Sequence, residues 1–217
     1  RRLIAEERFD AIFSSHPRAS VHVIAASLAG SCGIPWLADY RDRRFANTVV
    51  PFASPVHEAA NRRLEAWALR HAAAVSAINQ LILDDLVAHH PHLAGRGHVL
   101  PNGYDDDDPV EATDLGPGFW FVHTGKLYRR EQSVEAFLRG LAELPGDVKA
   151  LFAGDAPRVA PLVERVGLER RVRVEDSVPH ARSLGYQRAA DALLLVNTLR
   201  PESTTSKVFE YLRAGRP

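Results

Sequence analysis

The 217-residue sequence has no methionine, one cysteine and no net charge, and each of these absences excludes a class of protein. The single cysteine, Cys32, cannot close a disulfide within the chain, so we expect a reducing compartment and a cytoplasmic protein. Cys32 stands in an apolar stretch and is expected to be a small core residue rather than a nucleophile. With 27 basic and 27 acidic residues, no overall field attracts nucleic acid, and we expect no such partner.

Long apolar runs and dinucleotide fingerprints are also missing. No run approaches the roughly 18 residues of a membrane span. No G-x-G-x-x-G follows a strand-like run, which argues against a nicotinamide-dependent enzyme. Peripheral contact with the inner face of a membrane stays open as an alternative, without a clear basic amphipathic helix to carry it. Because the sequence begins without methionine and ends where a further element is expected, it is predicted to be cut at both ends.

Short apolar runs alternate with helix-like stretches along the sequence. The predicted strands are 11–16, 34–42, 73–79, 98–103, 119–127, 148–155, 172–179 and 192–197. The predicted helices are 19–33, 55–73, 80–90, 131–143, 157–166, 180–190 and 204–214. This alternation is typical of the α/β class, with parallel sheets covered on both faces.

The composition changes sharply near the middle of the chain. Residues 105–118 are dense in Pro, Gly and Asp, as is typical of a linker. We therefore predict two doubly wound domains, residues 1–104 and 119–217, facing a cleft. In such domains ligands bind beyond the carboxyl ends of the strands, so the residues there are the candidates.

Cations follow the first strand of the second half, in "HTGKLYRR". Gly125 allows close approach of a ligand, and the three cations Lys126, Arg129 and Arg130 suit a phosphate group. A plain solvated turn is the alternative for such a loop.

Two glutamates flank the start of the last predicted helix, in "PESTTSKVFEYL". Glu202 and Glu210 are eight positions apart, so both can face one cleft. Ser206 lies among N-cap types, and a helix N-terminus attracts phosphate. Glu210 stands among apolar neighbours, where an unpaired carboxylate is costly, and this favours a functional role.

A metal site is the tempting alternative, because four aspartates stand together at 105–108. Adjacent acids in a Pro/Gly-rich linker are usually solvated, so we expect no metal. The histidines His89, His90 and His92 do not have convincing zinc spacing, and His123 is expected to be a strand residue.

Together these stretches resemble the GT-B glycosyltransferases of family 4, which are retaining and use nucleotide sugars. The matching stretches, in the family's order, are "GIPWLADYRD", "AAVSAINQLILDDL", "VLPNGYD", "FVHTGKLYRREQSVEAFLRGL", "KALFAGD", "VRVEDSVPHARSLGYQRAADALLLV" and "SKVFEYLRAGRP". The resemblance covers nearly the whole chain, and Glu202 and Glu210 match the family's E-x7-E signature.

The resemblance implies a GT-B fold of two Rossmann-like domains and a role for each candidate residue. The second half would bind the donor through Gly125, Lys126, Arg129, Arg130, Ser177, Val178, Ser206, Lys207 and Glu210, with the base beside Ser177 and Val178 and the ribose on Glu210. Glu202 would contact the donor sugar and is a catalytic candidate, as are His16 and Asp42 on the acceptor side. The resemblance implies no cofactor and no obligatory metal. The acceptor would be a sugar or a lipid-linked sugar, and the reaction would belong to polysaccharide synthesis.

The sequence departs from the family in several places. It has "DYRD" where members often carry a histidine, and Asp176 where they usually have a glycine. The family's first strand with its glycine-rich loop is absent, as are the elements after "GRP", so both domains are predicted to be incomplete. Two alternatives therefore stay open: a non-catalytic GT-B domain that binds a nucleotide sugar or a partner, and a GT-B-shaped sugar-nucleotide epimerase.

Overall fold

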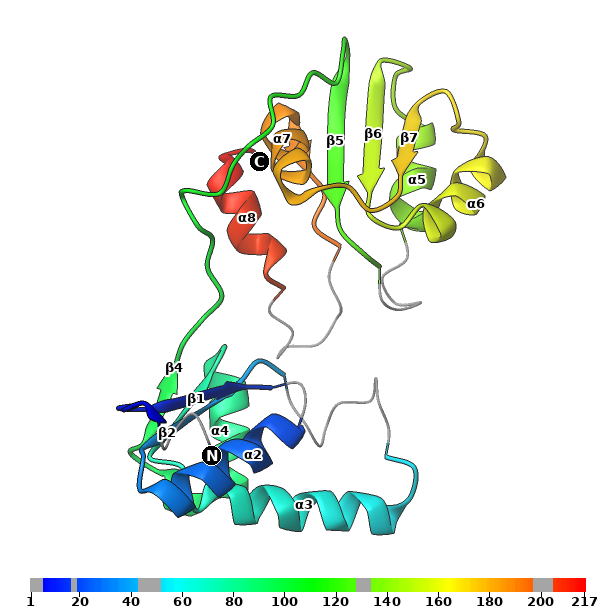
Figure 1. The fold of residues 1–217 in the computed structure, drawn as a ribbon. Helices are drawn as coiled ribbons and strands as arrows, with labels where there is room; N and C mark the ends of the chain where they lie inside the picture. The colour runs from blue at the N-terminus through cyan, green and yellow to red at the C-terminus, as the bar shows by residue number, and fades with distance from the viewer. Residues whose placement is uncertain (1–5, 17–18, 43–51, 128–133, 197–204) are drawn as a thin grey trace. The chain divides into compact units, whose positions relative to one another are not determined.

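The computed structural model describes residues 6–16, 19–42, 52–127, 134–196 and 205–217. The chain divides into two compact units, Arg1–Asn102 and Gly103–Pro217 (Figure 1). Each unit is a parallel α/β structure, as the alternating sequence pattern predicts. Among the described helices, none is long and apolar enough to cross a membrane.

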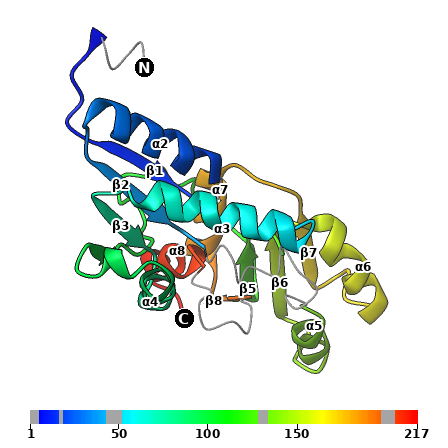
Figure 2. The same ribbon diagram turned by 90° about the horizontal axis from the view of Figure 1, so that it is seen from below.

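The first unit contains a parallel sheet in the order β1-β2-β3-β4. Its elements are β1 (Ile12–Ser15), α2 (Ala19–Cys32), β2 (Trp36–Tyr40), α3 (Pro55–Leu69), β3 (Ala74–Ala77), α4 (Gln80–His89), η1 (Pro91–Leu93) and β4 (Gly97–Val99). Helices α2 and α3 lie side by side (Figure 2). Strand order follows chain order, so each crossover moves one strand along the sheet.

The second unit contains a parallel sheet in the order β7-β6-β5-β8. Its elements are β5 (Phe119–Thr124), α5 (Glu135–Ala142), β6 (Val148–Ala153), α6 (Ala156–Val166), β7 (Val172–Glu175), α7 (His180–Ala189), β8 (Ala192–Leu193) and α8 (Lys207–Ala214). The order reverses at β5, because the chain moves outward to β7 and then returns to the other side of β5. Ligands bind such sheets at this kind of switch point.

Local sequence signals explain where the helices of the first unit begin. Ser54 caps α3 by accepting a hydrogen bond from the His57 amide at 3.2 Å, and Asn79 caps α4 by accepting one from Ile82 at 2.9 Å. The core of this unit packs apolar residues of β2 and β3 against α2, α3 and α4. Trp36 and Val75 at its centre are fully buried.

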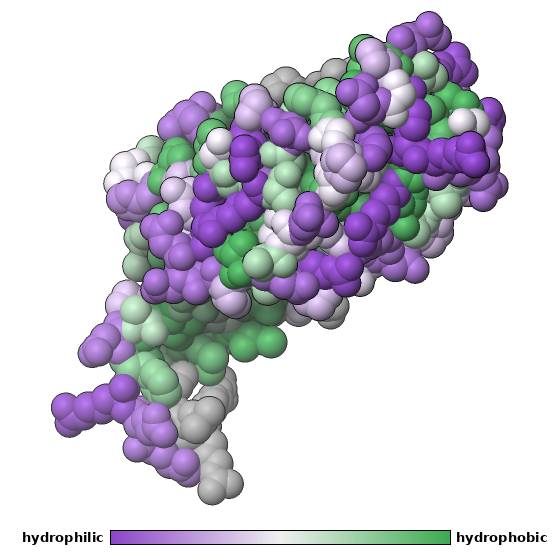
Figure 3. Space-filling model, turned by 90° about the horizontal axis from the view of Figure 1, so that it is seen from above, coloured by the Kyte–Doolittle hydropathy of each residue, from purple (hydrophilic) through white to green (hydrophobic). Residues whose placement is uncertain are grey.

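Alternate residues of β6 in the second unit face opposite layers. Ala150 and Phe152 pack in a cluster with residues of α5 and α6, whereas Leu151 and Ala153 pack in a second cluster with Tyr186 of α7. Both faces of this strand are therefore covered, which explains why the four residues Ala150–Ala153 are apolar in succession. Hydrophilic residues occupy most of the surface that is turned to the viewer in Figure 3.

Two local predictions differ from the structure. Cys32 is exposed rather than buried, because Ala29 is the last buried residue of α2 and Cys32 lies beyond it. Helix α3 ends at Leu69 rather than at 73, since the Ala73 amide already donates to the Trp36 carbonyl of β2 at 2.9 Å.

The predicted linker makes contacts of its own. Residues 105–118 contain neither helix nor strand and fall within the second unit. The Glu111 amide donates to the Ala181 carbonyl of α7 at 3.0 Å, and a side chain at Gly185 would collide with the Glu111 backbone. This segment therefore lies directly on α7.

Candidate functional site

Strands β5 and β6 are parallel neighbours, so their carboxyl ends lie together at one end of the second sheet, which we call its carboxyl edge (Figure 1). Each of the two strands is followed directly by a glycine. Gly125 and Gly154 have φ values of +112° and +128°, a region that side chains disfavour. A Cβ on Gly154 would lie 2.8 Å from the Gly125 backbone. The two turns thus pack backbone against backbone, and the edge is free of side chains at both positions.

Lys207, the first residue of α8, lies across this edge. A Cβ on Gly125 would come within 2.7 Å of the Lys207 ammonium nitrogen, so glycine leaves the room that this side chain occupies. Burial lowers the pKa of Lys207, and the nearby Glu210 carboxylate opposes that shift. Lys207 therefore places a half-buried cation over the backbone of Gly125.

The start of α8 adds a second source of positive potential. Ser206 occupies the N-cap position, makes no side-chain cap hydrogen bond and is exposed. The positive end of a helix dipole attracts anions. In this first turn the Lys207 amide donates to Thr205 Oγ1 at 3.4 Å, and the Val208 and Phe209 amides donate to the carbonyls of Thr205 and Ser206 at 3.3 and 3.0 Å. Lys126, which directly follows Gly125, is exposed, and its loop is fixed where the Leu127 amide donates to Asp155 at 2.9 Å. Two lysines and a helix N-terminus are therefore available at this edge.

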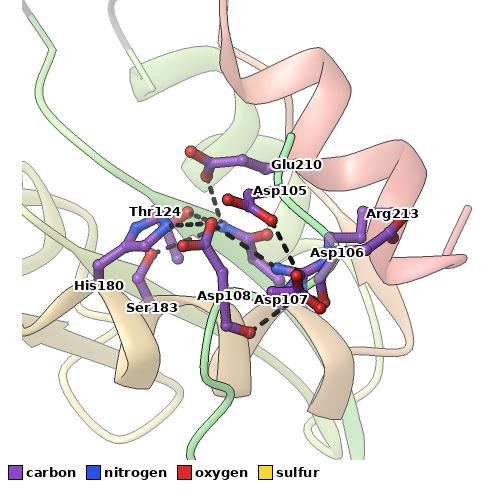
Figure 4. A network of polar contacts seen from close by, with 10 residues as sticks. Asp105, Asp106, Asp107, Asp108, Thr124, His180, Ser183, Glu210 and Arg213 are labelled. Carbon is purple, nitrogen blue, oxygen red and sulfur yellow. Dashed lines mark hydrogen bonds and ion pairs between the residues drawn. The ribbon is translucent and has the colours of Figure 1, made fainter. Parts of the chain in front are cut away.

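Glu210 lies on α8 three residues after Lys207 and is half-buried. The Gln187 side-chain nitrogen donates to Glu210 Oε2 at 3.0 Å and to Thr124 Oγ1 at 2.9 Å. Thr124 ends β5, and its amide donates to the Tyr211 hydroxyl at 3.1 Å. The carboxylate is thereby tied to the strand end beside Gly125. Figure 4 shows Glu210, Thr124 and Ser183 around this network.

Sequence reasoning missed Gln187, although a signal was present. Gln187 is fully buried in α7, within the buried run Leu184–Gln187. A single amide in such a run needs a partner, because an unpaired buried polar group costs about 1–3 kcal/mol. The partner here is a predicted site residue from another helix.

Ser177 and Val178 follow β7 at the same edge of the sheet. Ser177 is exposed, while Val178 packs against the cluster beneath α7. Asp176 is exposed as well. Arg129, Arg130 and Glu202 lie outside the described residues, so their predicted roles have no structural counterpart here.

His123 of β5 is a buried histidine near the same strand end. Its Nδ1 lies 2.9 Å from the Leu194 carbonyl oxygen, and its Nε2 has no hydrogen-bond partner among the described residues. Burial lowers the pKa of His123 to about 4, more than the Leu194 contact and Asp155 raise it. His123 is therefore neutral at neutral pH, as expected of a strand residue rather than of a cationic ligand.

The carboxyl ends of the first sheet carry a different group, centred on Asp39. Asp39 is buried at the end of β2 and accepts hydrogen bonds from the hydroxyls of Ser15 at 2.7 Å and Ser76 at 2.8 Å. Arg41 lies 3.6 Å from the same carboxylate and also donates to Leu100 and Asn102. Hydroxyls from both neighbouring strands, β1 and β3, therefore hold this carboxylate.

The two acceptor-side candidates lie in unlike surroundings. His16 directly follows β1 and is buried, with its ring stacked on Tyr40 at a centroid distance of 5.8 Å. Asp42 follows Arg41 and is exposed. Both lie at the carboxyl edge of the first sheet, and Asp42 is the more accessible of the two.

The aspartates at 105–108 are held by side chains of α7 and α8. Arg213 donates to the carbonyls of Asp106 at 2.7 Å and Asp108 at 3.1 Å, and His180 Nε2 lies 3.4 Å from an Asp108 carboxylate oxygen (Figure 4). Across the part of the chain that the structure describes, no group of three or more potential ligands could hold a metal ion.

Comparison with known proteins adds to this geometry. Residues 1–103 match the family model of the glycosyl transferase 4-like domain. The chain has the GT-B fold. No curated protein matches the sequence.

Several solved structures share this GT-B fold over the whole chain. HepE from Anabaena in complex with UDP has a TM-score of 0.72 and 18% identity, covering 100% of this chain and 60% of that one. Sucrose-phosphate synthase from Thermosynechococcus elongatus has a TM-score of 0.69 and 14% identity, with 100% and 57% covered. The chain thus spans about 60% of the length of HepE.

A sugar-nucleotide epimerase also shares the architecture. The UDP-GlcNAc 2-epimerase of Methanocaldococcus jannaschii has a TM-score of 0.57 and 13% identity, covering 99% of this chain and 71% of that one. Likeness at this level of identity concerns the fold alone. The reaction must be argued from the residues at the strand ends.

Proposed function

We propose that this protein is a glycosyltransferase that transfers a sugar from a nucleotide sugar to an acceptor hydroxyl. The observation that carries the proposal is the edge at β5, where Gly125, Lys207 and the tethered carboxylate of Glu210 come together. A nucleoside diphosphate offers the complementary groups, namely an anionic diphosphate and a ribose with two hydroxyl donors. The glycosyl transferase 4-like match over residues 1–103 supports the same class.

In the proposed donor site, the diphosphate lies against Gly125 and the amides at Ser206. Lys126 and Lys207 neutralise its charge, and Glu210 accepts hydrogen bonds from the ribose. The base lies beside Ser177 and Val178, as the resemblance predicts. Arg129, Arg130 and Glu202 remain predicted members of the site, the first two for phosphate and the third for the donor sugar.

The reaction breaks the bond between the anomeric carbon and the diphosphate and forms one to the acceptor oxygen. The nucleoside diphosphate leaves with the bonding electron pair, and the proton of the acceptor hydroxyl passes to the released diphosphate. Cationic side chains and a helix N-terminus offset the charge that develops on this leaving group, so no obligatory metal is proposed. Retention at the anomeric carbon is proposed from the family resemblance.

We place the acceptor on the first unit. Asp42 and His16 are the proposed catalytic residues on that side. The acceptor is proposed to be a sugar or lipid-linked sugar in polysaccharide synthesis at the cytoplasmic side of a membrane. UDP is the first nucleotide to test, because HepE has been solved with UDP and with UDP-glucose.

Calorimetric titration of this chain with UDP, GDP and their sugar conjugates tests the donor site, first without metal and then with magnesium. We expect metal-independent binding that is lost in Lys126→Ala and Glu210→Ala. A folded chain that binds none of these ligands contradicts the proposal and favours a non-catalytic domain.

The epimerase alternative is separated by the product. Incubation with UDP-GlcNAc or UDP-glucose, followed by NMR of the sugar ring, distinguishes inversion at a ring carbon from release of UDP. Release of UDP that depends on an added sugar acceptor supports transfer. A 2-epimer formed without an acceptor contradicts it.

A further inference from the structure

The side-chain amide of Gln187 joins three elements of the second unit. Gln187 belongs to α7, Thr124 ends β5 and Glu210 belongs to α8. The Gln187 nitrogen donates to Thr124 Oγ1 at 2.9 Å and to Glu210 Oε2 at 3.0 Å. Gln187 is 0% exposed, so water does not compete for either bond. The amide is a dry bridge between the strand end and the carboxylate.

The orientation of this amide follows from Glu210. An amide nitrogen carries two hydrogens, and the two short contacts use both; a third contact, to Ser183 Oγ, is 3.5 Å long. The other end of the amide, Gln187 Oε1, is buried and has no partner among the described residues. Turning the amide over would place this oxygen against the carboxylate, where two acceptors repel. The amide nitrogen therefore donates to Glu210, while the amide oxygen, Gln187 Oε1, has no partner among the described residues.

Two links fasten α8 to the end of β5. The first runs through Gln187, and the second is the hydrogen bond from the Thr124 amide to the Tyr211 hydroxyl at 3.1 Å. Tyr211 is adjacent to Glu210, so the backbone of α8 is already fixed at this point. What the Gln187 bridge adds is control of the Glu210 side chain itself, which otherwise has three rotatable bonds.

We propose that Gln187 is a positioning residue that holds Glu210 in the orientation in which it accepts the ribose hydroxyls of a nucleotide. Oε2 of Glu210 is occupied by the amide, and Oε1 has no hydrogen-bond partner in the described part of the chain. A fixed carboxylate binds more tightly than a mobile one because less side-chain freedom is lost on binding. This inference rests on the proposed function, since it takes Glu210 as the ribose ligand.

The proposal predicts a change in preference for ribose rather than a general loss of binding. In Gln187→Leu, which fills a similar volume without a donor, we expect UDP affinity to fall about tenfold. Affinity for 2′,3′-dideoxyuridine diphosphate, which lacks both hydroxyls, is expected to stay within twofold of the wild-type value. Ser183→Ala, which removes only the 3.5 Å contact, is the matched control and keeps the wild-type preference.

Calorimetric titration of wild type, Gln187→Leu and Ser183→Ala with each of the two ligands, six protein–ligand pairs in all, gives the result, with circular dichroism to show that each variant is folded. An unchanged ratio of UDP to dideoxy affinities in Gln187→Leu overturns the proposal. An equal loss of affinity for both ligands leaves that ratio unchanged and overturns it as well, because such a loss reports a general change in structure rather than a change in ribose binding.

A second measurement separates this inference from the proposed function. Urea unfolding of Gln187→Leu, Glu210→Ala and the double variant reports the coupling between the two side chains without any ligand. Additive effects show that the bridge does not hold Glu210 and overturn the inference even if nucleotides bind. A wild-type chain that binds no nucleotide overturns the proposed function and the ribose assignment together, whatever the coupling.

Discussion

The carboxyl ends of the two parallel sheets offer opposite chemistry. In the first sheet, Asp39 puts a buried carboxylate there and hydroxyls from both neighbouring strands satisfy it. In the second sheet, Gly125 and Gly154 remove side chains from the edge and Lys207 supplies a cation. The same architecture therefore yields a closed polar group at one edge and an open, anion-attracting edge at the other. The difference lies in which residue ends each strand.

The largest effect is expected from a methyl group at the second edge. Gly154→Ala would place its Cβ 2.8 Å from the Gly125 backbone in a region of positive φ. We expect the free energy of unfolding to fall by about 4 kcal/mol, measured by urea denaturation. Gly140→Ala in α5, where no atom lies within 4 Å of the new Cβ, is the control and is expected to stabilise by about 0.5–1 kcal/mol. Equal effects of the two substitutions would contradict the close packing of the turns.

Acid sensitivity should distinguish the second sheet from the first. The folded-state pKa of His123 is lowered from 6.5 to about 4, so between these values the unfolded chain binds a proton that the folded chain excludes. The free energy of unfolding therefore falls as pH falls through this window, by about 3 kcal/mol from this group. His123→Phe should remove that part of the slope in urea unfolding at successive pH values. Val99→Ala, at an exposed position of β4 that does not titrate, should leave the slope unchanged.

The carboxylate of the first sheet gives a smaller effect. Asp39→Asn keeps the shape but loses the charge that faces two hydroxyl donors and Arg41. We expect a loss of about 2 kcal/mol in the free energy of unfolding, with reduced hydrogen-exchange protection in β1 to β3. Asp10→Asn, at an exposed position, should change stability by less than about 0.5 kcal/mol. Protection lost in β5 and β6 instead would contradict the separation of the two edges.

The smallest expected effect concerns affinity at the second edge. Lys207→Met should weaken UDP binding about tenfold, which corresponds to about 1.4 kcal/mol. Because the pKa of Lys207 is lowered from 10.5 by burial, the wild-type affinity should fall with rising pH before a free lysine titrates, and Lys207→Arg should not show this fall. Lys149→Met, at the opposite end of the same sheet, is the control for charge and should leave affinity unchanged. A pH-independent wild-type affinity would show that Lys207 does not contact the phosphates.

The stability of the folded state at high pH follows from the same pKa. The unfolded chain keeps the lysine proton up to 10.5, whereas the folded chain releases it earlier. The free energy of unfolding therefore rises as pH rises through the interval between the two values. As pH rises, the affinity for UDP is expected to fall while the free energy of unfolding is expected to rise. These opposite changes distinguish a phosphate contact of Lys207 from a purely structural role.

Much of the fold could be read from the sequence because its signals are local. Apolar runs and helical spacing predicted the order of the elements, and the caps Ser54 and Asn79 begin their helices by contacts only three residues long. The position of Gly125, Lys126 and Ser177 beyond strand ends also follows from local pattern together with the rule for parallel sheets. The burial of Cys32 was predicted wrongly, because hydrophobic character alone does not show where a helix leaves the sheet.

The sequence by itself determined the α/β class, the two-part organisation and the family resemblance, since these depend on periodicity and on short motifs. Only the tertiary structure decided which side chains meet. Gln187 reaches Thr124 across 63 positions, and Asp39 reaches Ser76 across 37. Such contacts depend on how strands and helices from distant segments pack, and no local pattern encodes that packing. The chemistry of each edge is therefore a property of the assembled sheet.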